Sequence, residues 1–180
     1  LCASEPVVIE GASPSAQGDA AIIEILEEMG APIEWDHDAE TLTVGAGPLT
    51  AVTVDVGDTP DLLPTLAVLG MFAEGQMCLE NCGHVRFKET DRVGVMASAL
   101  GQIGAEVIEE STRLCIGSPP ADVGGITLGG AGDHRIIMAL SVLASAGDAP
   151  CVITGAEDVA VSYPDFFEAL SQLGGHVERL

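Results

Sequence analysis

One phrase of sequence recurs three times along the chain, and this repetition constrains the fold more than any other feature. It reads EILEEMGAPIEW at 24–35, SALGQIGAEVIE at 98–109 and EALSQLGGHVER at 168–179. Each copy predicts the end of an amphipathic helix, a glycine that ends it in the left-handed conformation, and a short alternating strand. The glycines Gly30, Gly104 and Gly174 lie 74 and 70 residues apart. We therefore expect structural repeats of about 70 residues.

A second phrase occurs twice, as DLLPTLAVLGMFAEG at 61–75 and DHRIIMALSVLASAG at 133–147. Both copies predict helices that are apolar on most sides, each followed by a strand. Together the phrases predict a β-α-β-α-β-β unit that is complete at 51–117, recurs at 118–180 and is truncated at 18–50. Such a unit cannot bury its apolar face alone. We therefore expect an α/β fold, an inverse α/β barrel around a pseudo-threefold axis with helices inside and sheets outside.

The periodicity of apolar residues gives the individual elements. We expect helices at 18–29, 59–73, 89–103, 134–146 and 163–173. We expect strands at 7–10, 33–35, 41–44, 51–54, 76–80, 106–109, 113–116, 125–128, 151–154 and 176–178. Residues 1–17 would be a linker and strand that lead into the domain at 18–180.

The chain is strongly acidic. Its 28 Asp and Glu residues stand against 6 Lys and Arg, for a formal net charge of −22. A nucleic acid or an anionic membrane would repel such a chain, so neither is an expected partner. Hydrophobic residues make up 47% of the chain, enough for a core, which excludes a disordered acidic tail. The charge fits either an ordinary acidic protein or a halophilic one, whose carboxylates are screened in molar salt, and it favours the second.

The five cysteines are odd in number and irregularly spaced, without a CxxC pair. This pattern predicts neither a disulfide framework nor a zinc site, and it favours a reducing cytoplasm. No apolar run reaches membrane-spanning length, and the N-terminus lacks a signal pattern. Because the sequence starts with Leu1 rather than Met, we expect a fragment of a longer protein.

The few basic residues are concentrated. Arg86, Lys88 and Arg92 lie in GHVRFKETDRVGVMASAL, where their spacing brings Lys88, Glu89 and Arg92 together at the start of one helix. Free N–H groups and the helix dipole favour an anion at such a start. The segment is therefore either an anion site or a capped helix start with an ordinary surface ion pair.

A segment of the next unit has the same character. A glycine-rich loop leads into a helix with Asp133 as candidate N-cap and Arg135 in its first turn. Asp61, with Asp55 and Asp58 nearby, opens the corresponding helix 72 residues earlier. Asp55, Asp58 and Asp61 are either helix caps or, on the functional interpretation, include a carboxylate that binds hydroxyls or acts as a base. Arginine-bearing helix starts on equivalent units can converge on one ligand.

At these positions the sequence resembles the 5-enolpyruvylshikimate-3-phosphate (EPSP) synthase family. The resemblance rests on TPDLLPTLAVLG at 59–70, RFKETDR at 86–92, GDHR at 132–135 and SYPDFF at 162–167. It implies a fold of two domains, each of three βαβαββ units. The chain would correspond to the C-terminal enolpyruvyl-transferase domain, with the N-terminal domain as its missing partner.

The resemblance also implies an activity, which is transfer of the enolpyruvyl group of phosphoenolpyruvate to the 5-hydroxyl of shikimate 3-phosphate in the shikimate pathway. No metal or organic cofactor would take part. Asp61 and Lys88 would contact the shikimate hydroxyls, and Arg92 and Arg135 would hold phosphoenolpyruvate. Glu89 would be the general acid and base at the phosphoenolpyruvate methylene. Protonation there makes a cationic carbon, the hydroxyl attacks it, and the tetrahedral ketal then loses phosphate.

Two positions depart from the family pattern. Val161 stands where the family commonly has a lysine, and His84 stands where some members have an asparagine that binds shikimate 3-phosphate. Without the N-terminal domain, we expect the chain to fold but not to turn over. The alternatives are a UDP-N-acetylglucosamine enolpyruvyl transferase, which should lack the KETDR and GDHR pairing, and a non-catalytic anion-binding module of the same fold.

Overall fold

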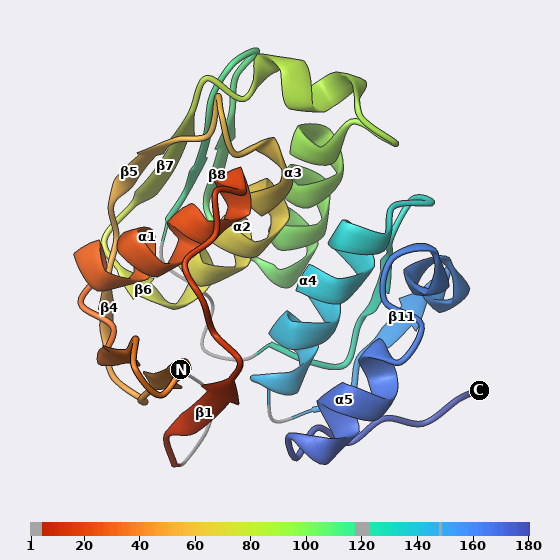
Figure 1. Ribbon diagram of the computed structural model, residues 1–180. Coiled ribbons are helices and arrows are strands. Elements are labelled where there is room, and N and C mark those ends of the chain that lie inside the picture. Colours follow the sequence, from red (N-terminus) through yellow and green to blue (C-terminus); the bar gives the residue numbers. More distant parts are fainter. Residues whose placement is uncertain (1–4, 118–122, 148) are drawn as a thin grey trace.

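The computed structural model describes residues 5–117, 123–147 and 149–180, which form a mixed α/β structure (Figure 1). The α-helices are α1 (Ile22–Glu28), α2 (Leu63–Phe72), α3 (Arg92–Ile103), α4 (His134–Ser145) and α5 (Phe166–Gln172). Short 3₁₀ helices are η1 (Gly18–Ala21), η2 (Pro60–Leu62), η3 (Gly83–Phe87) and η4 (Ala156–Val161). The strands are β1 (Val7–Glu10), β2 (Ile33–Asp36), β3 (Thr41–Val44), β4 (Leu49–Thr50), β5 (Thr53–Asp55), β6 (Ala73–Glu74), β7 (Met77–Glu80), β8 (Val107–Glu109), β9 (Leu114–Ile116), β10 (Thr127–Gly129) and β11 (Val152–Thr154).

These strands form several small sheets. The largest has the order β5-β7-β9-β8, in which β5 and β7 are parallel and the other neighbours antiparallel. An antiparallel sheet has the order β1-β3-β2, and β4-β6 and β10-β11 are parallel pairs. From β5 to β9 the strands and α-helices follow the order β5-α2-β6-β7-α3-β8-β9, which is the predicted β-α-β-α-β-β order with one additional two-residue strand, β6.

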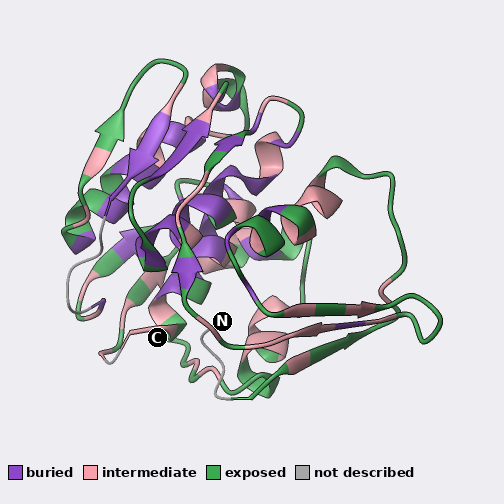
Figure 2. Ribbon diagram, turned by 90° about the vertical axis from the view of Figure 1, so that its left-hand side faces the viewer, coloured by how far each residue is buried: buried purple, intermediate pink, exposed green. Residues whose placement is uncertain are grey.

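The core lies where α2 packs against α3, α4 and the largest sheet. The α2 sequence, LPTLAVLGMF, is apolar all round, and the helix is correspondingly buried on most sides. A Cβ at Gly70 would lie 3.1 Å from Met77 Cβ and 3.4 Å from Ile116 Cβ, so the glycine allows α2 to approach the sheet closely. Figure 2 shows the buried residues gathered on these helices and strands. This packing fixes the starts of α2, α3 and α4 relative to one another.

The repeated glycines adopt the predicted left-handed conformation, with φ of +86° at Gly30 and +98° at Gly104 and Gly174. Strands β2 and β8 follow the first two, each paired with the next strand along the chain. The strand expected at 176–178 is wrong, because these residues have no regular structure. These residues pair with none of the described strands, and a strand needs a hydrogen-bonded neighbour.

Other differences are local. The expected helix starts at 18–21 and 60–62 are 3₁₀ turns, and α5 begins only at Phe166. Of the strand expected at 51–54, only residues 53–54 are extended, in β5, while 51–52 separate β5 from β4. Such 3₁₀ turns are frequent at the N-termini of α-helices.

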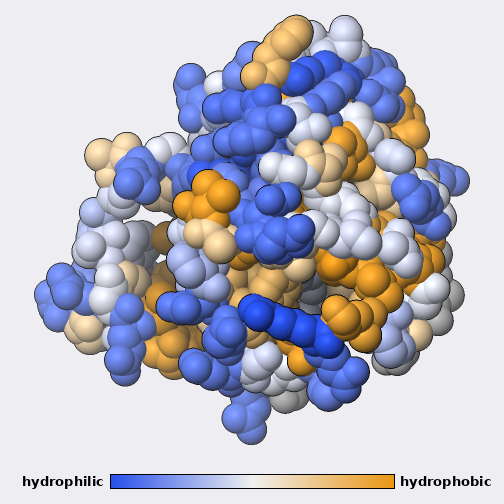
Figure 3. Space-filling model, turned by 90° about the vertical axis from the view of Figure 1, so that its right-hand side faces the viewer, coloured by the Kyte–Doolittle hydropathy of each residue, from blue (hydrophilic) through white to orange (hydrophobic). Residues whose placement is uncertain are grey.

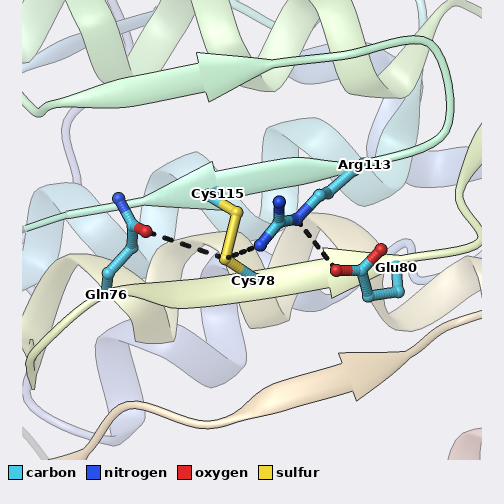
Figure 4. The surroundings of a disulfide bond; sticks show 5 residues. All are labelled: Gln76, Cys78, Glu80, Arg113 and Cys115. Atoms are coloured by element: carbon cyan, nitrogen blue, oxygen red, sulfur yellow. Dashed lines mark hydrogen bonds and ion pairs between the residues drawn. A yellow bond between two sulfur atoms is a disulfide. The ribbon is translucent and has the colours of Figure 1, made fainter.

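Cysteine pairing is a correction to the sequence analysis. Cys78 and Cys115 form a disulfide, although they are 37 residues apart (Figure 4). The antiparallel register of β7 and β9 sets them directly opposite each other, at the close spacing that a disulfide needs. Arg113 Nη2 donates to Cys78 Sγ at 3.3 Å, and Arg113 Nε forms an ion pair with Glu80 at 2.8 Å. Spacing along the chain could not reveal a pair that only the sheet brings together.

Of the remaining cysteines, Cys82 is buried, and burial raises the pKa of its thiol. Cys151 is half-buried, and Cys2 lies outside the described residues.

The described residues include no group of His, Cys, Asp and Glu that could hold a metal ion. None of the described helices is long and apolar enough to cross a membrane. On the face drawn in Figure 3, hydrophilic side chains cover much of the surface and apolar ones form patches between them.

Candidate active site

Three helix starts contribute charged side chains to one cluster. Asp61 lies in η2 just before α2, Arg92 is the first residue of α3, and Arg135 is in the first turn of α4. Lys88 and Glu89 precede α3. Because α2 contacts both α3 and α4, residues far apart in the sequence meet here.

Arg92 is the centre of this cluster, with a side chain only 1% exposed. Its Nη1 donates to Asp61 Oδ1 at 2.6 Å, its Nη2 to Glu89 Oε2 at 2.7 Å, and its Nε to Asp133 Oδ2 at 2.7 Å. Every nitrogen of the guanidinium therefore faces a carboxylate. Such charge-assisted bonds are stronger than neutral ones, and they fix the planar group in one orientation.

Asp61 links this buried arginine to more accessible cations. Its Oδ2 forms an ion pair with Arg135 Nη2 at 2.9 Å, and its Oδ1 lies 3.8 Å from Lys88 Nζ. Arg135 Nη1 also reaches Asp19 Oδ2, from η1, at 3.4 Å. Lys88 and Arg135 are each about one third exposed, so both can reach a ligand.

The surroundings set the protonation of two groups. Burial on its own raises the pKa of Asp61, but the hydrogen bond from Arg92 and the charges of Arg135, Arg92 and Lys88 outweigh it and hold the pKa below its usual value. Burial on its own lowers the pKa of Arg92, but hydrogen bonds to Asp133 and Asp61 hold it above its usual value. Asp61 is therefore ionised at neutral pH and can accept a hydrogen bond.

The structure brings together Asp61, Lys88, Glu89, Arg92 and Arg135 from the sequence analysis. His84 lies in η3 and makes no side-chain hydrogen bond or ion pair with any described residue. Val161 ends η4 with its side chain 79% exposed. Asp55 faces elsewhere, because it accepts hydrogen bonds from Asn81 Nδ2 and from the Gly57 amide.

Arg86 also turns away, since it binds Asp91 and Glu109 at 2.8 Å each.

The sequence did not identify two carboxylates of the cluster, Asp133 and Asp19, as site residues. Asp133 was expected only as a helix cap, and it does cap α4 by accepting from the Arg135 amide at 2.9 Å. Asp19 carried no signal in the sequence, because it meets Arg135 across 116 residues.

Charge balance limits what the cluster can do alone. The carboxylates of Asp19, Asp61, Glu89 and Asp133 neutralise its cations, Lys88, Arg92 and Arg135. The described residues therefore present no excess of positive charge to an anionic ligand. What they do present is a fixed carboxylate-rich wall with two accessible cations, suited to binding hydroxyls and transferring protons.

Comparison with known proteins agrees with these features. The family described as EPSP synthase (3-phosphoshikimate 1-carboxyvinyltransferase) matches residues 2–170. The 3-phosphoshikimate 1-carboxyvinyltransferases of Halorubrum lacusprofundi and Halobacterium salinarum are 53% and 48% identical over 97% and 96% of the chain. A solved EPSP synthase from Acinetobacter baumannii superimposes with a TM-score of 0.85 at 28% identity, over 96% of this chain and 42% of that one. The chain spans about two fifths of these relatives, namely 39% and 40% of the two archaeal sequences. By this match and by the motifs that form the cluster, the chain belongs to the EPSP synthase family.

Proposed function

We propose that this chain supplies one wall of the active site of a 3-phosphoshikimate 1-carboxyvinyltransferase. The observation that supports this most is the convergence of Asp61, Lys88, Glu89 and Arg135 around the buried Arg92. The reaction transfers the enolpyruvyl group of phosphoenolpyruvate to the 5-hydroxyl of shikimate 3-phosphate and releases phosphate. It needs an acid, a base and cations in fixed positions, and it needs no metal or organic cofactor.

The proposed roles follow from exposure and partners. Asp61, ionised and next to Lys88, would bind the shikimate hydroxyls and accept the proton of the attacking one. Glu89 is half exposed and, in its protonated form, would donate the proton to the phosphoenolpyruvate methylene, then take a proton back from the resulting methyl group as phosphate leaves. Arg135 would bind a phosphoenolpyruvate oxygen, since its guanidinium is accessible. A phosphoenolpyruvate contact by Arg92 stays a prediction. It would require Arg92 to break its hydrogen bond to Asp61 or to Glu89.

The remaining expectations belong to the same proposal. The units would surround a pseudo-threefold axis as an inverse barrel, with residues 18–180 forming the C-terminal domain after a linker at 1–17. An N-terminal domain would supply the missing positive charge, and with it the contact that Val161 cannot make. His84 would bind the phosphate of shikimate 3-phosphate. The enzyme would act in the cytoplasm of a halophile, without nucleic-acid or membrane partners, as its charge of −22 suggests.

Phosphate release tests this proposal. We expect the complete gene product to release phosphate from phosphoenolpyruvate and shikimate 3-phosphate in molar salt. The isolated 180-residue chain should fold but lose at least about 10³-fold in turnover, because the charge-stabilising groups of the other wall are missing. Release only with UDP-N-acetylglucosamine would favour the rival transferase. No release with either acceptor would favour a non-catalytic anion-binding module, and full activity of the 180-residue chain would refute the shared active site.

A further inference from the structure

Asp133 is the most deeply buried charged group in the cluster, with a side chain 0% exposed. Both of its oxygens are occupied. Oδ1 accepts from the backbone N–H of Arg135 at 2.9 Å, which caps α4, and Oδ2 accepts from Arg92 Nε at 2.7 Å. A carboxylate this enclosed cannot touch a substrate, and it is stable there only because both oxygens have partners.

These two bonds join two helices. Arg92 is the first residue of α3, and Asp133 immediately precedes α4, so one carboxylate fastens one helix start to the other. Arg92 Nη1 and Nη2 hold Asp61 and Glu89 at 2.6 and 2.7 Å, and Nη2 also donates to Asp133 Oδ1 at 3.5 Å. The placement of both proposed reacting carboxylates therefore depends on how Asp133 orients the guanidinium.

Asp91 offers an internal comparison. It caps α3 by accepting from the Gly94 amide at 2.9 Å, and it pairs with Arg86 at 2.8 Å. Arg86, however, continues to Glu109, not to Asp61 or Glu89. Asp91 is also half exposed, whereas Asp133 is enclosed. Among the described residues, a helix-capping aspartate that pairs with an arginine thus occurs twice, and of these two Asp133 is the one that connects to the cluster.

We propose that Asp133 is a positioning residue of the active site, which holds Arg92 in the orientation that places Asp61 and Glu89. This inference rests on the proposed function for its effect on turnover, but not for its effect on Arg92. It assigns no substrate contact to Asp133. If so, removing the negative charge of Asp133 should lower mainly kcat, although no substrate contacts this residue.

The first test measures the arginine itself. We would record the ¹⁵N-resolved Nε–H signal of Arg92 in the complete protein and in the variants Asp133→Asn and Asp91→Asn. Asparagine caps helices as well as aspartate does, so Asp133→Asn removes the charge and keeps the cap. We expect hydrogen exchange at Arg92 Nε to accelerate about tenfold or more in Asp133→Asn, because the charged acceptor is gone. Exchange should be unchanged in Asp91→Asn, and unchanged exchange in Asp133→Asn would overturn the proposal.

The second test measures turnover in the same proteins. We expect kcat to fall by about 10²-fold in Asp133→Asn, with a smaller change in KM, because misplaced reacting groups cost rate more than affinity. Asp91→Asn should keep the original kcat. A kcat of Asp133→Asn equal to that of the original protein would overturn the proposal. If the original protein does not turn over at all, the proposed function fails, while the Arg92 signal still decides the role of Asp133.

A third comparison decides the matter should Asp133→Asn not fold. Asp61→Asn and Glu89→Gln alter the more exposed acceptors of Arg92. If Asp133 fixes the guanidinium, Arg92 Nε–H stays protected in both variants. Loss of protection in either one would show that the exposed carboxylates, not Asp133, orient Arg92.

Discussion

In the complete protein, Glu89→Gln should lower kcat by about 10²–10⁴-fold, the usual contribution of a general acid or base. Glutamine keeps the shape of the side chain and its hydrogen-bonding oxygen, but it cannot donate a carboxylic proton to the phosphoenolpyruvate methylene. Shikimate 3-phosphate should still bind, because its proposed contacts are Asp61 and Lys88. Steady-state phosphate release and calorimetric titration with shikimate 3-phosphate measure the two quantities.

Glu109 supplies the matched control. It is a half-exposed glutamate that pairs with Arg86 at 2.8 Å, much as Glu89 pairs with Arg92 at 2.7 Å. Glu109→Gln should leave kcat unchanged. An unchanged kcat in Glu89→Gln would remove Glu89 from the mechanism. Loss of shikimate 3-phosphate binding in that variant would instead show that Glu89 acts on binding.

The second large effect concerns stability. Arg92→Met should lower the free energy of unfolding by about 3–5 kcal/mol, because it leaves a buried carboxylate without its cation. That carboxylate is Asp133, which has no contact with solvent. Urea unfolding at constant molar salt, followed by circular dichroism, measures the change.

Two further variants separate this cause from lost packing. Arg113→Met removes an arginine that is 39% exposed and paired with Glu80, and it should cost at most about 1 kcal/mol. The double variant Arg92→Met with Asp133→Asn should recover part of the loss, since no uncompensated charge remains. A loss under about 1 kcal/mol in Arg92→Met would contradict the buried ion pair. The absence of any recovery in the double variant would assign the loss to packing.

Much of the fold follows from local sequence. The apolar α2 segment and the glycines at the helix ends have a physical meaning wherever they occur, so helices and left-handed turns were predicted correctly from them. The strand at 176–178 was not, because pairing depends on a neighbour and not on alternation alone. The Cys78–Cys115 disulfide was missed for a similar reason, since only the β7-β9 register sets its two residues opposite each other.

The candidate site shows the same division. Charged helix starts on repeated units predicted that Asp61, Arg92 and Arg135 would meet, and they do. The spacing treated Lys88 and Arg92 alike, whereas the structure leaves Lys88 accessible and encloses Arg92. Burial of this kind depends on how α2, α3 and α4 pack, and residue spacing within one helix does not predict it. Asp19 lay beyond prediction because its contact crosses from η1 to α4.

The neutralised charge of the cluster has a physical consequence for binding. Phosphoenolpyruvate and shikimate 3-phosphate both carry several negative charges, and a wall with as many carboxylates as this one does not attract them by itself. On the proposed function, selective binding would depend on cations from outside the chain, combined with the directional contacts of Lys88 and Arg135. The missing domain would then hold the anions, while this chain would supply the reacting carboxylates.

A crystal structure of the complete protein with shikimate 3-phosphate and phosphoenolpyruvate bound tests the central claim most directly, with the inactive Glu89→Gln variant used to trap both. We expect Lys88 Nζ, the Arg135 guanidinium and the Asp61 carboxylate to lie within about 3.2 Å of substrate oxygens, with Asp133 enclosed and still bonded to Arg92. Substrates bound elsewhere, with these three side chains facing only solvent and one another, would contradict it.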